Sequence, residues 1–267
     1  MLAESIAMTG ERNRYLPDAS AFQAPLRLSV AAPAYNEAEG IKLVVEGWRR
    51  YLASSADVAT FEILVCNDGS CDATGDILDT LARLHSEVRP IHFTRNQGAA
   101  AALTAAISAT TQDWVLLIDS DGQFPIENLE LMWKTLRRQR APVAIGIRNK
   151  KDSLFARFGT AASGMLCNWF HCSSIRDFNS AFKLVWGPLL RDLNFEARGM
   201  NYSTEVTSRL LECGVAIAEV EIDHRPRTTD ASSMRLLRGA AHRCLFVSYV
   251  GMRQLLFGIG VLRRPLS

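Results

Sequence analysis

Short apolar runs and helical patterns alternate regularly through the first 150 residues of the chain. The apolar runs, each about the length of a buried strand, cover residues 26–32, 61–66, 88–94, 114–119 and 142–147. The segments with helical periodicity cover residues 38–53, 73–85, 98–110 and 126–139. Strands that alternate with helices form a largely parallel sheet with helices on both faces. This part of the chain therefore predicts an α/β fold.

The pattern is less regular beyond residue 150. Helices are predicted at residues 153–170 and 202–213, and strands at residues 181–185 and 215–222. The chain has 267 residues, 48% of them hydrophobic, which is enough to build one large core. No internal repeat or low-complexity linker divides it. We expect a loosely ordered lead-in, one catalytic domain and a C-terminal segment, at residues 1–25, 26–232 and 233–267.

Polar side chains follow three of the predicted strands. The clusters are Tyr35-Asn36-Glu37, Asn67-Asp68-Gly69-Ser70 and Asp119-Ser120-Asp121. Right-handed crossovers bring the carboxyl ends of parallel strands to one edge of the sheet, which is where α/β proteins bind ligands. Three polar clusters at one edge therefore predict a shared site.

The third cluster ends the apolar run of residues 114–118 with two carboxylates, Asp119 and Asp121. Because Ser120 separates them, both carboxylates can point to the same side as the strand opens into a loop. Two neighbouring carboxylates need a counter-charge, and Mg²⁺ or Mn²⁺ prefers oxygen ligands and binds substrate phosphates. An isolated Asp-x-Asp is more often a turn or a helix cap, so the other clusters are needed to predict a metal site.

Composition argues against several classes of protein. A net charge of +2 argues against a dedicated nucleic-acid-binding protein. The six cysteines show no C-x-x-C pair, which favours reduced, packed thiols in a cytosolic protein. Glu4 and Glu11 near the N-terminus, without an apolar core, argue against a signal peptide. We also expect no ordinary transmembrane helix, because no run of about 18 apolar residues is uninterrupted.

Six short motifs occur in order along residues 27–232. They are Pro33-Ala34-Tyr35-Asn36-Glu37, Val65-Cys66-Asn67-Asp68-Gly69-Ser70-Cys71-Asp72-Ala73-Thr74, Arg95-Asn96-Gln97-Gly98, Asp119-Ser120-Asp121-Gly122-Gln123, Arg176-Asp177-Phe178-Asn179-Ser180-Ala181-Phe182-Lys183-Leu184 and His224-Arg225-Pro226-Arg227. In this order they make the chain resemble the family 2 glycosyltransferases of GT-A fold, especially the branch similar to dolichyl-phosphate (polyprenyl-phosphate) mannose synthase. The resemblance implies a GT-A, Rossmann-like sheet and an inverting hexosyltransferase.

The resemblance also implies that the early motifs bind a nucleotide diphosphate sugar. The nucleotide-binding residues would be Pro33, Tyr35, Asn36, Glu37, Asp68, Gly98 and Asp119. Asp119 and Asp121 would hold Mg²⁺ or Mn²⁺ against the donor diphosphate, with Gln123 adding its amide oxygen. The same positions also suit structural roles, which include helix caps at Asn36, Glu37 and Asn96 and a turn at Asp68. The family usually has two aspartates where this chain has Asn67 and Asp68.

The later motifs would face the acceptor, for which two chemistries remain open. A hydroxyl acceptor needs a general base, and Asp177 is the candidate. A polyprenyl phosphate is already ionised, so Asp177 would only orient other groups. The residues that would then bind the acceptor phosphate are Arg157, Arg176, Arg225, Arg227 and Ser232. A structural Asp177–Arg176 pair is the alternative.

Two further residues bear on catalysis. Arg148 is a candidate second clamp on phosphate, and the alternative is a solvated arginine beside Lys150 and Lys151. Asp230 occupies the position of a glycine in the family's late loop. Together with Asn67, it motivates a different class of function, a scaffold that binds nucleotide sugars without turnover.

The C-terminal segment is basic. Residues 231–267 contain six arginines and no acidic residue. At helical spacing, one face carries Arg235, Arg238, His242, Tyr249 and Arg253, and much of the remainder is apolar. This pattern predicts a basic amphipathic helix that associates peripherally with an anionic membrane surface, at the cytoplasmic inner face. Docking on the catalytic domain, or on a second subunit of a homo-oligomer, is the alternative.

Overall fold

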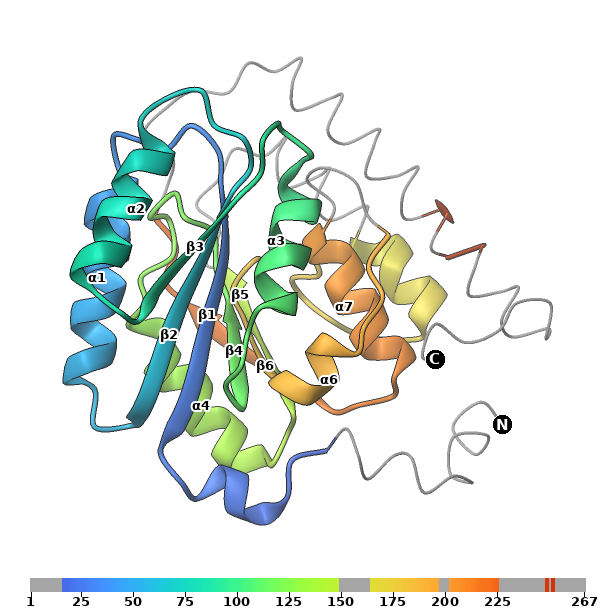
Figure 1. The fold of residues 1–267 in the computed structure, drawn as a ribbon. Coiled ribbons are helices and arrows are strands. Elements are labelled where there is room, and N and C mark those ends of the chain that lie inside the picture. Colours follow the sequence, from blue (N-terminus) through green and yellow to red (C-terminus); the bar gives the residue numbers. More distant parts are fainter. Residues whose placement is uncertain (1–15, 149–163, 197–201, 226–247, 250, 253–267) are drawn as a thin grey trace.

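The computed structural model describes residues 16–148, 164–196 and 202–225, together with residues 248, 249, 251 and 252. Within these residues, one seven-stranded sheet lies between two layers of helices (Figure 1). The strand order is β3-β2-β1-β4-β6-β5-β7. The predicted α/β architecture is therefore confirmed.

All described strands of the sheet run parallel to one another except β6. The strands are β1 (Leu26–Ala34), β2 (Val58–Asn67), β3 (Val88–His92), β4 (Trp114–Leu117), β5 (Val143–Arg148), β6 (Lys183–Trp186) and β7 (Ile217–Ile222). β1 pairs in parallel with β2 and β4, β2 with β3, and β5 with β7. β6 runs antiparallel to both of its neighbours, β4 and β5. This reversed strand brings the segment before it to the edge where the parallel strands end.

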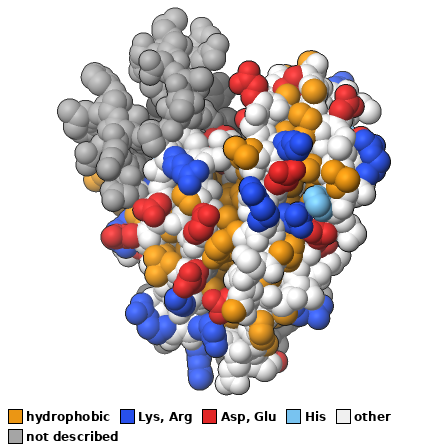
Figure 2. Space-filling model, turned by 90° about the vertical axis from the view of Figure 1, so that its left-hand side faces the viewer, with side chains coloured by type: hydrophobic (Ala, Val, Ile, Leu, Met, Phe, Trp, Pro, Cys, Tyr) orange, Lys and Arg blue, Asp and Glu red, His pale blue; other side chains and the backbone are white. Residues whose placement is uncertain are grey.

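Each face of the sheet carries its own helical layer. On one face lie α1 (Ile41–Ser54), α2 (Thr74–Leu84) and α4 (Asn128–Gln139). On the other face lie α3 (Ala99–Ser108), α6 (Gly187–Arg191) and α7 (Tyr202–Glu212), with a further helical stretch at residues 164–171. Figure 2 views the molecule from the side of α1 and α2, where basic and acidic side chains are intermixed.

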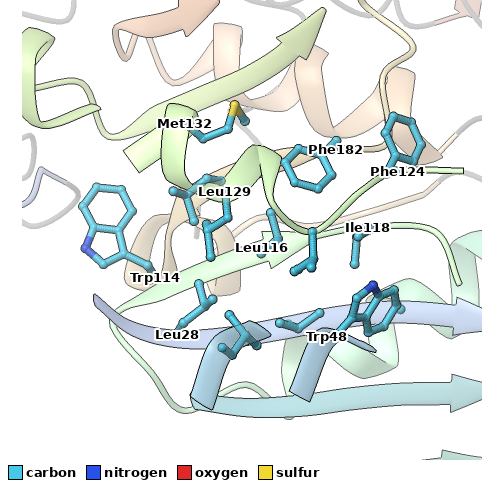
Figure 3. Packing of buried hydrophobic residues seen from close by; sticks show 14 of the residues in the cluster. Leu28, Trp48, Trp114, Leu116, Ile118, Phe124, Leu129, Met132 and Phe182 are labelled. Carbon is cyan, nitrogen blue, oxygen red and sulfur yellow. The ribbon is translucent and has the colours of Figure 1, made fainter. Parts of the chain in front are cut away.

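Alternate strand residues supply the cores of the two layers. In β1, Leu28 and Val30 pack with α1 and α4, whereas Ala31 packs with α3. Trp48 of α1 and Met132 of α4 lie in the first of these cores (Figure 3). Burial of a large apolar side chain contributes about 1.5–3 kcal/mol relative to exposure, so these cores hold the strand ends in place.

β1 continues through Pro33 to Ala34, although the sequence predicted that the strand would end at residue 32. Pairing between β1 and β4 ends at Ala31, so Pro33 removes no hydrogen bond from that ladder. The Pro33 carbonyl accepts a hydrogen bond from Ser120 Oγ (2.7 Å) beyond the end of β4. The proline therefore sits at the point where the sheet opens into the candidate site.

Other boundaries also differ from those predicted. α1 begins at Ile41 rather than at residue 38, and its N-cap is Gly40. The Glu37 carbonyl accepts from the backbone N–H groups of Gly40 and Ile41 (3.0 and 2.9 Å), so a turn precedes the helix. The helix-cap roles considered for Asn36 and Glu37 are therefore wrong. The short helix α6 was not predicted.

The few described residues near the C-terminus contact the rest of the chain. Tyr249 Oη donates to Glu196 Oε2 (2.8 Å), and a Cβ added to Gly251 would lie 2.4 Å from the Phe170 ring. No helix in the described ranges is long and apolar enough to cross a membrane. Most of the predicted C-terminal helix lies outside the described residues.

Candidate active site

The loops after β1, β2 and β4 enclose a pocket of about 350 Å³ at one edge of the sheet. Its lining residues are Pro33, Ala34, Tyr35, Glu37, Asp68, Asn96, Gly98, Ala99, Asp119, Ser120, Asp121 and Tyr202. All three polar clusters predicted at strand ends thus contribute to one pocket. The volume lies within the range of about 300–1,000 Å³ that is common for small-molecule sites.

Hydrogen bonds join the loop after β1 to the loop after β2. The backbone N–H of Asn36 donates to Ser70 Oγ, and Asn36 Oδ1 accepts from the N–H of Cys71 (both 2.9 Å). The N–H of Glu37 donates to Thr74 Oγ1 (2.9 Å). Asn36 has a φ of 54°, a left-handed conformation that asparagine tolerates. Asn36 therefore shapes the first loop and does not line the pocket.

Asp68 holds the start of α3. Its two carboxylate oxygens accept from the backbone N–H groups of Gln97 (2.7 Å) and Gly98 (2.9 Å). Gly98 has φ 96° and ψ 152°, which glycine adopts most readily, and it is the N-cap of α3. The capping role considered for Asn96 is therefore wrong, because Asp68 bonds these N–H groups from the loop that follows β2. Asn96 instead lines the pocket.

Asn67, the departure from the family's usual pair of aspartates, lies outside the pocket lining. Its Oδ1 accepts from the N–H of Ser70 (3.1 Å), and its Nδ2 lies 3.2 Å from His92 Nδ1. His92 Nε2 in turn lies 3.1 Å from Asp79 Oδ1. An amide can make both Asn67 contacts, as donor to a neutral imidazole nitrogen and as acceptor from the backbone. The residue thus stabilises the loop around Asp68.

Asp119 and Asp121 both line the pocket and are partly buried. Carboxylate oxygens beside a pocket fit the donor preference of Mg²⁺ or Mn²⁺. The described residues contain no group of three or more His, Cys, Asp and Glu side chains suited to a metal. Among the described side chains, Asp119 and Asp121 could supply two carboxylate ligands, and water or substrate oxygens commonly fill the other positions around Mg²⁺.

Tyr202, which the sequence analysis did not single out, belongs to the same site. Its hydroxyl donates a hydrogen bond to Asp119 Oδ1. Burial, followed by the nearby charge of Asp119, raises the pKa of Tyr202 well above its usual value. The phenol therefore stays protonated and remains a donor to the carboxylate.

Gln123 follows Asp119 and Asp121 in the same loop but does not line the pocket. Its backbone N–H donates to Asp121 Oδ1 (3.0 Å), and its Nε2 donates to the carbonyl oxygen of Arg225 (3.2 Å). The N–H of Arg225 donates back to the Gln123 carbonyl (2.8 Å). Gln123 therefore joins the loop after β4 to the late loop. Nearby, the His224 ring packs edge-on against Phe124 at 4.9 Å.

Asp177 and Arg148 form a buried ion pair. Arg148 Nε donates to Asp177 Oδ2 (2.8 Å) and Nη2 donates to Oδ1 (2.9 Å), a two-pronged arrangement. The backbone N–H of Arg148 also donates to Oδ2 (3.2 Å). The Asp177 side chain is only 1% exposed. The pair thus occupies both carboxylate oxygens.

Arg176 is not the ion-pair partner of Asp177, so the alternative of a structural Asp177–Arg176 pair is wrong. Its side chain contacts Glu221 at 3.0 Å and Glu219 at 3.7 Å on β7. The solvated role considered for Arg148 is also wrong, because its guanidinium is bound to Asp177. Asp177 pairs with Arg148 instead of Arg176 because β6 runs antiparallel and brings Asp177 beside the end of β5, where Arg148 lies.

Lys183 is a second cation near this pair. It lies on β6, is 1% exposed, and its Nζ donates to the Ser180 carbonyl. Burial lowers the pKa of Lys183 to about 7, against the opposing attraction of Asp177. Lys183 belongs to the fifth of the six sequence motifs, and no role was predicted for it. Its burial could not be read from a strand pattern alone.

Three of the residues predicted to bind acceptor phosphate lie outside the described residues. They are Arg157, Arg227 and Ser232. Lys150, Lys151 and Asp230 also lie outside them. Arg225 is exposed at the end of a described segment, and it does not line the pocket.

Comparison with known proteins identifies the family. The model of glycosyl transferase family 2 matches residues 29–189. Glycosyltransferase AglD of Haloferax volcanii is 28% identical over 216 residues, which cover 78% of this chain and 35% of that protein. The bactoprenol glucosyl transferase of Shigella phage SfX is 39% identical over 102 residues, covering 38% of this chain and 33% of that protein.

A further relative is the dolichyl-phosphate beta-glucosyltransferase ALG5C of Trichomonas vaginalis. It is 33% identical over 108 residues, covering 39% of this chain and 32% of that protein. The chain thus spans about a third of the length of the curated relatives it matches.

Solved structures confirm the GT-A fold. Glucosyl-3-phosphoglycerate synthase from Mycobacterium tuberculosis, in complex with Mn²⁺, uridine diphosphate and phosphoglyceric acid, superposes with a TM-score of 0.66 at 19% identity. The match covers 92% of this chain and 83% of that chain. At this identity the likeness concerns the fold, whereas the family model covers the three strand-end clusters and Asp177. The chain belongs to glycosyl transferase family 2.

Proposed function

We propose that this chain is the catalytic unit of a metal-dependent, inverting glycosyltransferase that moves a hexose from a nucleotide diphosphate sugar to a polyprenyl phosphate. The names of two relatives support this acceptor, because one is a bactoprenol and the other a dolichyl-phosphate glucosyltransferase. The buried pair of Asp177 and Arg148 is the single structural observation that carries the choice of acceptor.

The pocket supports binding of a nucleotide sugar. Tyr35 and Glu37 would contact the nucleoside from the first loop, and Asp68 from the second, since all three line the pocket. Asp119 and Asp121 would hold Mg²⁺ or Mn²⁺ against the diphosphate. The bound ion would stabilise the charge that develops on the nucleoside diphosphate as the bond to the sugar breaks. The M. tuberculosis synthase was crystallised with Mn²⁺ and uridine diphosphate, which favours this assignment.

The geometry of Asp177 favours an acceptor that needs no general base. A base must come within hydrogen-bonding distance of the proton that it removes. Both Asp177 oxygens accept from Arg148, and the side chain is almost fully buried. A phosphate acceptor is already ionised, so Asp177 would serve by fixing the position of Arg148. Arg176 and Arg225 are exposed and remain candidates to bind the acceptor phosphate, as do Arg157, Arg227 and Ser232.

Exposed apolar side chains support peripheral association with a membrane. Met165 and Trp169 are 72% and 70% exposed, and Tyr249 and Met252 are also exposed. The contact of Gly251 with Phe170 brings their two segments together. Tryptophan and tyrosine are favoured at membrane interfaces, and the six arginines of residues 231–267 would attract anionic lipid. We therefore expect this surface to lie against the membrane that holds the acceptor.

The function is tested by a screen of radiolabelled nucleotide sugars with a polyprenyl phosphate as acceptor. We expect label in a lipid fraction that mild acid releases, and none when the matched polyprenol without phosphate replaces the acceptor. Transfer to the polyprenol, or to a stable saccharide, would instead favour a hydroxyl acceptor. Transfer to phosphoglycerate, an acceptor that is soluble and carries no lipid, is measured for comparison with transfer to the polyprenyl phosphate. Nucleotide-sugar binding without turnover on any acceptor would favour the scaffold.

The membrane surface is tested separately by sedimentation with anionic liposomes. Trp169→Ala combined with Met165→Ala should reduce the bound fraction. Leu43→Ala combined with Leu84→Ala is the matched control, because these leucines are equally exposed on the opposite helical layer. Equal binding by both double variants and the wild-type protein would contradict the assignment.

A further inference from the structure

We infer that Tyr202 is a positioning residue of the metal site, which orients Asp119 for metal binding through the hydrogen bond from its hydroxyl group. The inference rests on the proposed function, because it assumes that Asp119 and Asp121 bind a divalent cation. It concerns a residue that comes from α7, 83 positions along the chain from Asp119.

The tyrosine is placed to act on one carboxylate oxygen. Its hydroxyl donates to Asp119 Oδ1, and its side chain lines the pocket beside Asp121. With one oxygen fixed, the orientation of the Asp119 carboxylate is fixed and its second oxygen is presented in a defined direction. Nearby carboxylates repel each other, so a neutral donor on one of them also lowers the free energy of the pair before a cation arrives.

The tyrosine ring is itself held firmly. It packs against the apolar cores on both faces of the sheet. Tyr202 is the first residue of α7, and this helix is tied to the segment around Asp177. Thr207 Oγ1 donates to the Phe178 carbonyl (3.0 Å), and Thr204 Oγ1 donates to Asn179 Oδ1. A group on a rigid helix can hold a ligand more accurately than a group on a loop.

This arrangement links the two sides of the site. The segment that follows Asp177 anchors α7, and α7 places the hydroxyl on Asp119. Partners that hydrogen-bond to metal ligands orient them, and loss of such a partner lowers metal affinity by about 10–100-fold. We therefore expect the hydroxyl to matter for metal binding rather than for folding.

The test compares Tyr202→Phe with Tyr249→Phe. Both substitutions remove a hydroxyl that donates to a carboxylate, but Tyr249 bonds Glu196, which does not line the pocket. Binding of Mn²⁺ in the presence of uridine diphosphate is measured from the loss of the free Mn²⁺ signal in electron paramagnetic resonance. Thermal unfolding checks that each variant is folded, and Asp121→Asn provides the reference for a damaged metal site.

We expect Tyr202→Phe to raise the Kd for Mn²⁺ by about 10–100-fold while Tyr249→Phe leaves it unchanged. In transfer assays, the Mn²⁺ concentration for half-maximal rate should rise, and kcat at saturating Mn²⁺ should return to within about threefold of wild type, because the ligands themselves are intact.

Wild-type Mn²⁺ affinity in folded Tyr202→Phe would overturn the inference and leave the proposed function standing. A higher KM for the donor with unchanged Mn²⁺ affinity would also overturn it, because the hydroxyl would then act on the donor directly. If the wild-type protein bound no Mn²⁺, both the inference and the metal dependence of the proposed function would fail.

Discussion

The two sides of the site that we propose to bind the donor and the acceptor are built by different interactions. On the donor side, hydrogen bonds between backbone N–H groups and small polar side chains shape the loops, as at Asn36 and Asp68. On the acceptor side, buried charges do so, since Arg148 binds Asp177 and Lys183 is buried nearby. The donor side thus presents carboxylates to a pocket, whereas the acceptor side neutralises its carboxylate internally.

The comparison shows that similar side chains can have opposite consequences for stability. A carboxylate at a pocket can be changed with little effect on folding, because water reaches it. A buried carboxylate paired with a guanidinium cannot, because its removal leaves a charge without compensation. We expect substitution of the pocket carboxylate Asp121 to affect activity alone, and substitution of the buried Asp177 to affect both activity and stability.

The largest expected effect is that of Asp121→Asn on transfer. Loss of several kcal/mol of charge stabilisation should lower kcat/KM by at least about 10³-fold, since each 1.36 kcal/mol is a factor of ten. Unfolding in urea should be unchanged. Asp113→Asn, at an exposed ion pair with Arg27, is the control and should retain activity. Transfer by Asp121→Asn at the wild-type rate, or wild-type transfer that a chelator leaves unchanged, would contradict the metal mechanism.

The next largest effect concerns stability on the acceptor side. Asp177→Ala leaves Arg148 partly buried without its partner, which should lower the free energy of unfolding by about 3–5 kcal/mol. Glu221→Ala breaks the exposed contact with Arg176 and should change stability by at most about 1 kcal/mol. Urea unfolding followed by circular dichroism measures both. If both variants lowered the free energy of unfolding by similarly small amounts, the expected importance of the buried ion pair for stability would be contradicted.

The donor side could be largely predicted from the sequence. Each of its strands is a local apolar run, and the polar residues that follow each run must lie at the strand end. The clusters around Tyr35, Asp68 and Asp119 therefore meet in one pocket as expected. The exact start of α1, the course of β1 through Pro33 and the contacts of Asn36, Asn96 and Gln123 were missed, because they depend on individual hydrogen bonds.

The acceptor side could not be predicted in the same way. Four residues of β6 carry no signal of strand direction, and insertion of this strand between β4 and β5 decides which residues meet. The partner of Asp177 is therefore Arg148, 29 positions away, rather than the adjacent Arg176. Tyr202 was missed for the same reason, since its contact with Asp119 spans two elements distant in sequence.

A smaller effect is expected in the pH dependence of stability. Because the pKa of Lys183 is about 7 in the folded protein and higher in the unfolded chain, the unfolded chain binds more protons above pH 7. The free energy of unfolding of the wild-type protein should therefore increase as the pH rises from about 7 towards 10, because the buried Lys183 amine is then neutral. Below pH 7 the amine is charged, and the full free-energy cost of burying this charge is present.

Lys183→Met removes this titration. The stability of the variant relative to wild type should fall by about 3–4 kcal/mol between pH 7 and pH 10, as measured by urea unfolding at several pH values. Lys134→Met, at an exposed lysine beside Glu130, is the control and should show no such trend in this range. A pH-independent difference for Lys183→Met would contradict the burial of a titrating amine.

The smallest effect is expected from Asn67→Asp, which restores the family's usual residue. The side chain contacts His92 and Ser70 rather than the pocket, so the KM for the donor should stay within about twofold of wild type. Stability should fall by about 1 kcal/mol, because the substitution replaces the amide that lies against His92 Nδ1 with a carboxylate, which has no N–H to donate. A large change in donor KM would show that Asn67 acts on the nucleotide.

The most direct test of a metal-dependent nucleotide site is the binding of uridine diphosphate by calorimetry, with Mn²⁺ and then with a chelator. The wild-type protein should bind at least about tenfold more tightly with Mn²⁺, and Asp121→Asn should lose this difference. Equal affinity of the wild-type protein under both conditions would contradict the assignment of Asp119 and Asp121 to the metal.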